Sequence, residues 1–172
     1  GQNSYAIWLA KFGNTSISVA NTSRAVVVDT FDIVDVQLYE NCAHCAYHVN
    51  VLGEDPVAYL AGYIKLLIDG WLVKFSQSPA VGFPDAVVQI KPSQLVLGFA
   101  RGWSEGKSVF ITPEDIGKAY ERMPSGQRPR GAMYWCINEG DKPANGTNAT
   151  IDFASGFNAF LNVRSKPATG HQ

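Results

Sequence analysis

Within the predicted strand Phe31–Asn41, which reads FDIVDVQLYEN, three polar side chains recur at every second position of the otherwise apolar stretch Ile33–Tyr39. Successive side chains point to opposite faces of a strand, so Asp35, Gln37 and Tyr39 are predicted to share one face. Burying three polar groups is costly unless they are paired or used. They are therefore candidates either for a hydrogen-bonded network inside a barrel or for binding and catalysis.

Bulky side chains crowd a second stretch, Arg130–Asp141 (RGAMYWCINEGD), in which Met133 and Trp135 are predicted to share a face. A tryptophan near the end of a strand is either a core residue or a flat platform for a sugar ring. The Gly-containing segment Phe99–Gly106, with Trp103, is predicted to shape a cleft beside it. It lacks the spacing of a phosphate-binding loop.

The cysteines favour a disulfide over a metal site. The chain has three, of which Cys42 and Cys45 form a C-x2-C motif shortly before His48, and Cys136 follows Trp135. A structural zinc site needs four ligands, and the sequence offers no second pair. We therefore expect no metal and no cofactor, and a loop disulfide of Cys42 and Cys45, within the chain or to another chain.

Four N-x-[ST] sequons, at Asn14, Asn21, Asn145 and Asn148, favour a secreted glycoprotein. The chain shows neither a signal-peptide pattern nor an apolar run long enough for a membrane span, which indicates a mature or processed extracellular chain.

Composition indicates one globular unit. The 172 residues are 46% hydrophobic and 17% charged, which is typical of a packed core, and the net charge of −1 gives no field that would attract nucleic acid or anionic lipid. We expect a domain over residues 1–164 and a flexible tail over residues 165–172.

Strands and helices are predicted to alternate along the chain, with nearly all-apolar strands, as in parallel α/β folds. This pattern gives four strands, about half of a closed (β/α)8 barrel, and does not distinguish an open sheet from a barrel. The predicted strands are Ser16–Asn21, Phe31–Asn41, Ser93–Ala100 and Gly131–Asn138; the predicted helices are Asp55–Phe75, Thr112–Met123 and Asp152–Arg164.

These strands resemble the last four barrel strands of glycoside hydrolase family 18 chitinases of the hevamine-like type. The stretch FDIVDVQLYEN is similar to their sixth strand, SQLVLGFA to the seventh, RGAMYWCINEGD to the eighth, and SISVAN would be the fifth. The resemblance implies a half barrel, strands five to eight, and hydrolysis of β-1,4-linked N-acetylglucosamine assisted by the substrate's own N-acetyl group.

The resemblance also implies roles for individual residues. Tyr39 and Gln37 would position the N-acetyl group, Trp135 would lie under the sugar ring, and Asp35, Met133 and Trp103 would line the site. The family's D-x-x-D-x-D-x-E motif, which carries the catalytic acid, does not occur in this chain. We therefore expect a companion polypeptide that carries barrel strands one to four.

Three function hypotheses remain open at this point. The first is a chitinase-like enzyme that is active only with its companion, since this chain alone offers no carboxylate in the place of the acid. The second is an inactive chitinase-like lectin, inhibitor or structural protein. The third is an unrelated open α/β domain in which the same residues belong to the core.

Overall fold

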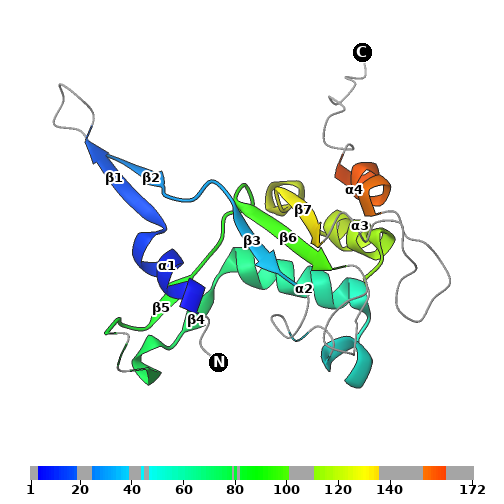
Figure 1. Ribbon diagram of the computed structural model, residues 1–172, viewed down its shortest axis with the longest axis horizontal. Coiled ribbons are helices and arrows are strands. Elements are labelled where there is room, and N and C mark those ends of the chain that lie inside the picture. Colours follow the sequence, from blue (N-terminus) through cyan, green and yellow to red (C-terminus); the bar gives the residue numbers. More distant parts are fainter. Residues whose placement is uncertain are drawn as a thin grey trace, which may run out of the picture.

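The computed structural model describes residues 4–18, 25–38, 44, 47–78, 80, 82–100, 111–135 and 153–161. Its centre is a parallel sheet of three strands in the order β3-β6-β7: β3 (Val34–Gln37), β6 (Leu95–Ala100) and β7 (Gly131–Trp135) (Figure 1). The α/β class predicted from the sequence is confirmed.

Three helices complete the α/β unit: α2 (Pro56–Asp69), α3 (Pro113–Arg122) and α4 (Phe153–Leu161). The Asp55 carboxylate accepts a hydrogen bond from the backbone N–H of Ala58 (2.9 Å) and so caps the start of α2. The helix ends six residues before the predicted Phe75, because Gly70 adopts φ +95°, which other residues rarely tolerate. As predicted, Thr112 caps α3, accepting from the N–H of Asp115 at 3.1 Å.

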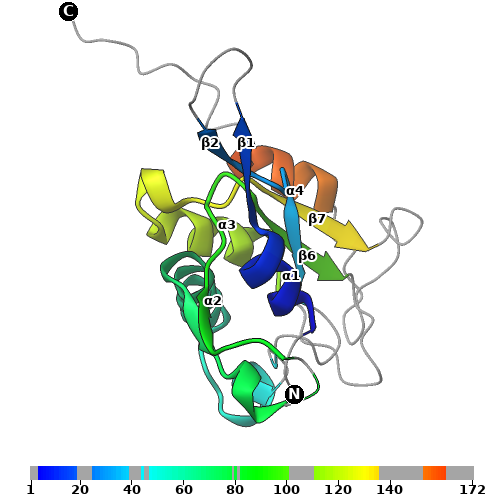
Figure 2. The ribbon, with the colours of Figure 1, turned by 90° about the vertical axis from the view of Figure 1, so that its left-hand side faces the viewer.

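The main core lies between these helices and one face of the sheet. Figure 2 shows α2 and α3 together on one side of β6 and β7. Leu60 and Ile64 of α2 and Leu95 of β6 are each 0% exposed, and the rings of Phe99 and Phe157 lie 6.0 Å apart between β6 and α4. The apolar side chains of the strands and those on the inner sides of the helices therefore bury one another.

The remaining elements lie mostly beyond the β3 edge of the sheet (Figure 1). They are the helix α1 (Ser4–Phe12), the hairpin of β1 (Asn14–Ser18) and β2 (Ala25–Asp29), the antiparallel pair β4 (Trp71–Val73) and β5 (Ala86–Val88), and the short helical turns η1 (Tyr47–Val51), η2 (Phe75–Gln77) and η4 (Ser125–Gln127). Among the described residues, no helix is both long and apolar enough to cross a membrane.

The predicted strand Ser16–Asn21 does not join the parallel sheet, contrary to expectation. Its described part belongs to β1, which pairs antiparallel with β2, for example Ile17 with Val26. The prediction overlooked Ala25–Asp29 (AVVVD), whose β-branched residues favour a strand and whose nearness in the chain makes a local hairpin easy to close. The described part of the parallel sheet therefore has three strands.

Candidate functional site

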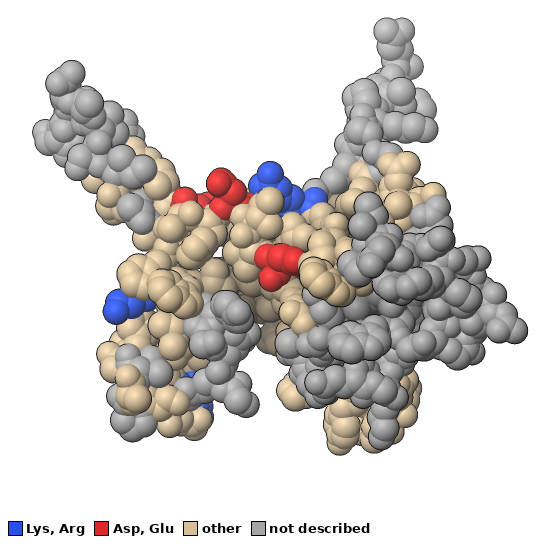
Figure 3. Space-filling view, viewed as in Figure 1, with Lys and Arg blue, Asp and Glu red and all other residues tan. Residues whose placement is uncertain are grey.

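The sheet has a face that α2, α3 and α4 do not cover. Alternation along the strands turns Val36, Leu97 and Tyr134 toward the helices, where they lie in or against the main core. The alternate side chains form what we call the open face: Asp35 and Gln37 of β3, Val96 and Gly98 of β6, and Met133 and Trp135 of β7. Figure 3 views the molecule from the side opposite to α2 and α3, and its described surface carries few acidic or basic side chains.

The centre of the open face is shaped by Gly98. The register places Gln37 on one side of Gly98 and Met133 on the other. A Cβ atom at Gly98 would lie 2.9 Å from Oδ1 of Asp35 and 3.1 Å from Cε of Met133. The missing side chain therefore leaves space over the central strand that a carboxylate and a thioether from the two outer strands border.

Trp135 lies at the carboxyl end of β7, opposite Ala100 of β6, and 59% of its surface is exposed. It is not a core residue, which removes one of the two interpretations left open by the sequence. Since the carboxyl ends of parallel strands lie at one edge of a sheet, Gln37 and Trp135 are at the same end of the open face. An exposed indole on the same face of the sheet as the Gln37 amide is a suitable surface for a sugar ring.

Several predicted residues lie outside the described part of the chain: Tyr39, Cys42, Cys45, Trp103, Cys136, Asn21, Asn145 and Asn148. Their roles in catalysis, disulfide formation and glycosylation stay predictions. Asn14 is described; it is the first residue of β1 and is exposed, as an attached glycan requires. No group of three or more His, Cys, Asp or Glu residues that could hold a metal ion occurs in the described ranges.

The Asp35 carboxylate lies in an unusual electrostatic environment. Partial burial raises its pKa above the ordinary range of an aspartate. The other side chains of the open face are uncharged, and among the described residues no lysine or arginine forms an ion pair with Asp35. The open face therefore makes ionisation of this carboxyl group less favourable than it is in water.

We expect Asp35→Asn to remove part of the dependence of stability on pH. Because the folded state raises the pKa of Asp35, the folded protein holds this proton more tightly than the unfolded chain, and stability falls as pH rises through this range. Relative to Asp35→Asn, the wild type should lose stability as pH increases from about 3.5 to 7. Urea unfolding of both proteins across this range measures the difference.

A free energy difference between the wild type and Asp35→Asn that does not change with pH would contradict the expectation.

Sequence reasoning identified Asp35, Gln37, Met133 and Trp135 but overlooked Gly98, which brings two of them together. A glycine inside the apolar strand LVLGFA was the available signal, because a strand glycine often marks a close approach of other groups.

No family model, no curated protein and no solved structure matches this chain.

Proposed function

We propose that this chain is a chitinase-like module of glycoside hydrolase family 18 type that binds β-1,4-linked N-acetylglucosamine. One observation carries the proposal: Gln37, Met133 and the exposed Trp135, named from motifs far apart in the sequence, lie together on the open face of a parallel sheet. Catalytic groups of α/β barrels are built at the carboxyl ends of such strands.

In the proposed reaction, the sugar whose anomeric carbon is attacked stacks on Trp135. Tyr39 and Gln37 hold its N-acetyl group so that the carbonyl oxygen attacks the anomeric carbon, while the bond from that carbon to the leaving oxygen breaks. A carboxylic acid supplied by the companion polypeptide protonates the leaving oxygen. Water then opens the resulting cyclic intermediate and restores the N-acetyl group with retention of configuration.

The companion is proposed to carry strands one to four, and this chain strands five to eight, of one (β/α)8 barrel. In the described part of the chain, the outer edges of β3 and β7 have no neighbouring strand, and such edges readily pair with other strands. Assembly in this form requires Ser16–Ser18, which pair with β2 here, to pair with β3 instead. A disulfide from Cys42 or Cys45 to the companion and secretion of the complex belong to the same proposal.

A carbohydrate-binding role without catalysis is the second candidate. It is favoured by the open face itself, where Asp35 is the only carboxylate among the described residues and lies deeper along β3 than Gln37. The isolated chain is therefore expected to bind chitin oligosaccharides and not to hydrolyse them.

The first test is calorimetric titration of the chain with a chitin tetrasaccharide. We expect Trp135→Ala to weaken binding by about tenfold, the loss of roughly 1.4 kcal/mol that an aromatic contact can supply. Trp8→Ala is the matched control, because Trp8 is equally exposed at 57% but lies on α1, and it should leave the affinity unchanged. Absence of binding by the wild type, or an equal loss in both variants, would refute the sugar site.

The second test concerns the companion. Native mass spectrometry of material purified from its source, followed by denaturing analysis with and without reductant, should reveal a second polypeptide. Its sequence decides between the two candidates, since the D-x-x-D-x-D-x-E motif supplies the acid. A monodisperse single chain under all conditions would refute the split barrel.

A further inference from the structure

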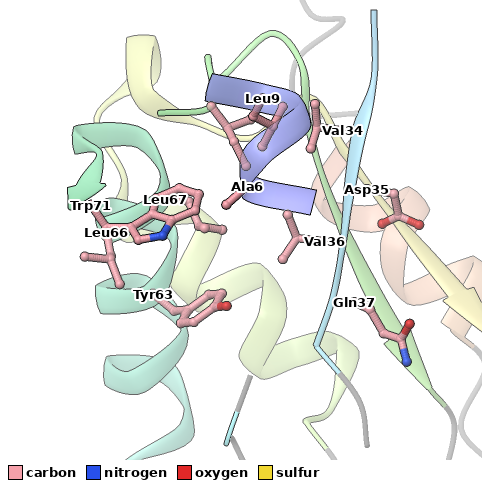
Figure 4. A pocket seen from close by; sticks show the side chains of 11 residues that line it. Ala6, Leu9, Val34, Asp35, Val36, Gln37, Tyr63, Leu66, Leu67 and Trp71 are labelled. Carbon is pink, nitrogen blue, oxygen red and sulfur yellow. The ribbon is translucent and has the colours of Figure 1, made fainter. Parts of the chain in front are cut away.

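A cavity of about 290 Å³ lies along the outer edge of β3, on the side away from β6 (Figure 4). Helix α1 contributes Ala6 and Leu9 to one end, and Trp71, at the start of β4, lies across the cavity beside α2. Tyr63 and Leu66 of α2 form the wall that faces β3. The cavity is thus bounded by a strand edge on one side and a helix on the other.

Backbone groups of β3 form the strand side of this cavity. The N–H groups of Val34 and Leu38 donate to carbonyl oxygens of Gln94 and Gly98, both at 2.8 Å. Alternate residues of a parallel strand bond to opposite sides, so the N–H and C=O of Asp35 point away from β6. In Figure 4 the Val36 side chain points toward the cavity and the Asp35 side chain points away from it, so Asp35 lines the cavity with its backbone.

A donor and an acceptor on one strand residue are the groups that an extended peptide pairs with when it adds a strand to a sheet. The opposite wall offers the aromatic rings of Tyr63 and Trp71 and the aliphatic Leu66. A cavity of this size is at the small end of ligand sites, so it suits one apolar side chain and the backbone beside it.

The charge of Asp35 adds a second requirement for the ligand. Neighbouring residues of an added strand point to opposite faces, so an apolar residue in the cavity places the next side chain on the open face. Directly opposed side chains on one face have their Cβ atoms about 5 Å apart. Since the described residues give Asp35 no cationic partner, a lysine or arginine at that position is complementary.

We propose that the outer edge of β3 and the adjoining cavity bind an extended peptide segment in which an apolar residue is next to a lysine or arginine. The peptide adds a strand beside β3, its apolar side chain enters the cavity between Tyr63 and Trp71, and its cation pairs with Asp35. A second copy of this chain fits poorly, because pairing β3 with β3 brings two Asp35 carboxylates together. The inference does not depend on the proposed sugar chemistry. It concerns the form of the chain described here, in which β1 pairs with β2 and leaves the outer edge of β3 open.

The test uses a dye-labelled peptide, acetyl-Thr-Lys-Leu-Lys-Thr-amide, and fluorescence anisotropy with the full chain. Three altered probes separate the contributions: Gly in place of Leu removes the anchor, Glu in place of Lys reverses the charge, and N-methylation of Leu blocks a backbone hydrogen bond. We expect each change to weaken binding by about tenfold or more, because each removes one of the contacts described.

Two protein variants locate the site. Leu66→Glu places a charge in the cavity wall without disturbing the core, since Leu66 is 48% exposed, and it should abolish binding. Leu72→Glu is the matched control; Leu72 is 57% exposed on β4, does not line the cavity, and should leave binding intact. Asp35→Lys should reverse the preference, so that the Glu probe binds more tightly than the Lys probe.

Failure of the Lys probe to bind, equal loss in Leu66→Glu and Leu72→Glu, or an unchanged preference in Asp35→Lys would overturn the proposal. A chitin tetrasaccharide is added as competitor in a separate titration. Displacement of the peptide by the sugar would assign the cavity to the carbohydrate and also overturn the proposal. Peptide binding without competition supports it, whatever the outcome of the sugar titration.

Discussion

Ile64→Ala should lower the free energy of unfolding by about 2–5 kcal/mol, the range for truncating a fully buried aliphatic side chain. Ile64 is 0% exposed and lies on α2 in the main core, which also contains residues of β6 and α3. Truncation of this side chain leaves a cavity between the helices and the sheet, and these two layers cannot fill it unless they move. Urea unfolding at neutral pH, followed by circular dichroism, measures the change.

The matched control for this substitution lies two residues further along the same helix. Leu66 is 48% exposed, so Leu66→Ala removes the same chemical group from a position that is already half in water, and it should cost less than about 1 kcal/mol. If both variants lose the same stability, α2 does not pack on the sheet through the face that contains Ile64.

Gly98→Val should destabilise the protein by about 1–3 kcal/mol, as overpacking of a filled site usually does. The new Cβ alone would lie 2.9 Å from Oδ1 of Asp35 and 3.3 Å from the backbone oxygen of Val36. The carboxylate can rotate away, whereas the backbone of β3 cannot yield without disturbing the sheet. Differential scanning calorimetry should show a lower Tm, and binding of chitin oligosaccharides should weaken because the open face is distorted.

A second glycine provides a control for which the expected change in stability has the opposite sign. Gly62 lies within α2 with no atom near the place of a Cβ, so Gly62→Ala is expected to stabilise the protein by about 0.5–1 kcal/mol through helix propensity. Both substitutions add one or a few carbons to a glycine. A stabilising Gly98→Val would show that Asp35 and Met133 leave room for a side chain at residue 98.

The predictions were most accurate where the start signals of an element and the spacing of its apolar residues indicate the same structure. The helix α3 was predicted almost to the residue, because Thr112 and Pro113 are strong start signals and the apolar spacing matches a helix. The strands β3, β6 and β7 were predicted as apolar runs, although β3 and β6 begin two or three residues later than predicted. The shared face of Asp35 and Gln37 followed from alternation alone.

Other features depend on tertiary contacts that no local pattern carries. The strand β4 follows α2 after a single glycine and was included in the helix, because WLV suits a helix as well as a strand until β5 pairs with it. The pairing of β1 with β2 is likewise a contact between two segments, and the residues of β1 alone do not specify the partner strand.

The order of the strands has a consequence for the synthesis of the chain. Val34 of β3 pairs with Leu95 of β6, roughly 60 residues later, so the sheet cannot begin to form until this whole crossover has been made. At ordinary elongation rates this delay lasts about 3–12 s, during which an apolar strand waits without its neighbour. Newly made chains are therefore expected to depend on chaperones that hold extended apolar segments, and slower translation should reduce the yield of folded protein.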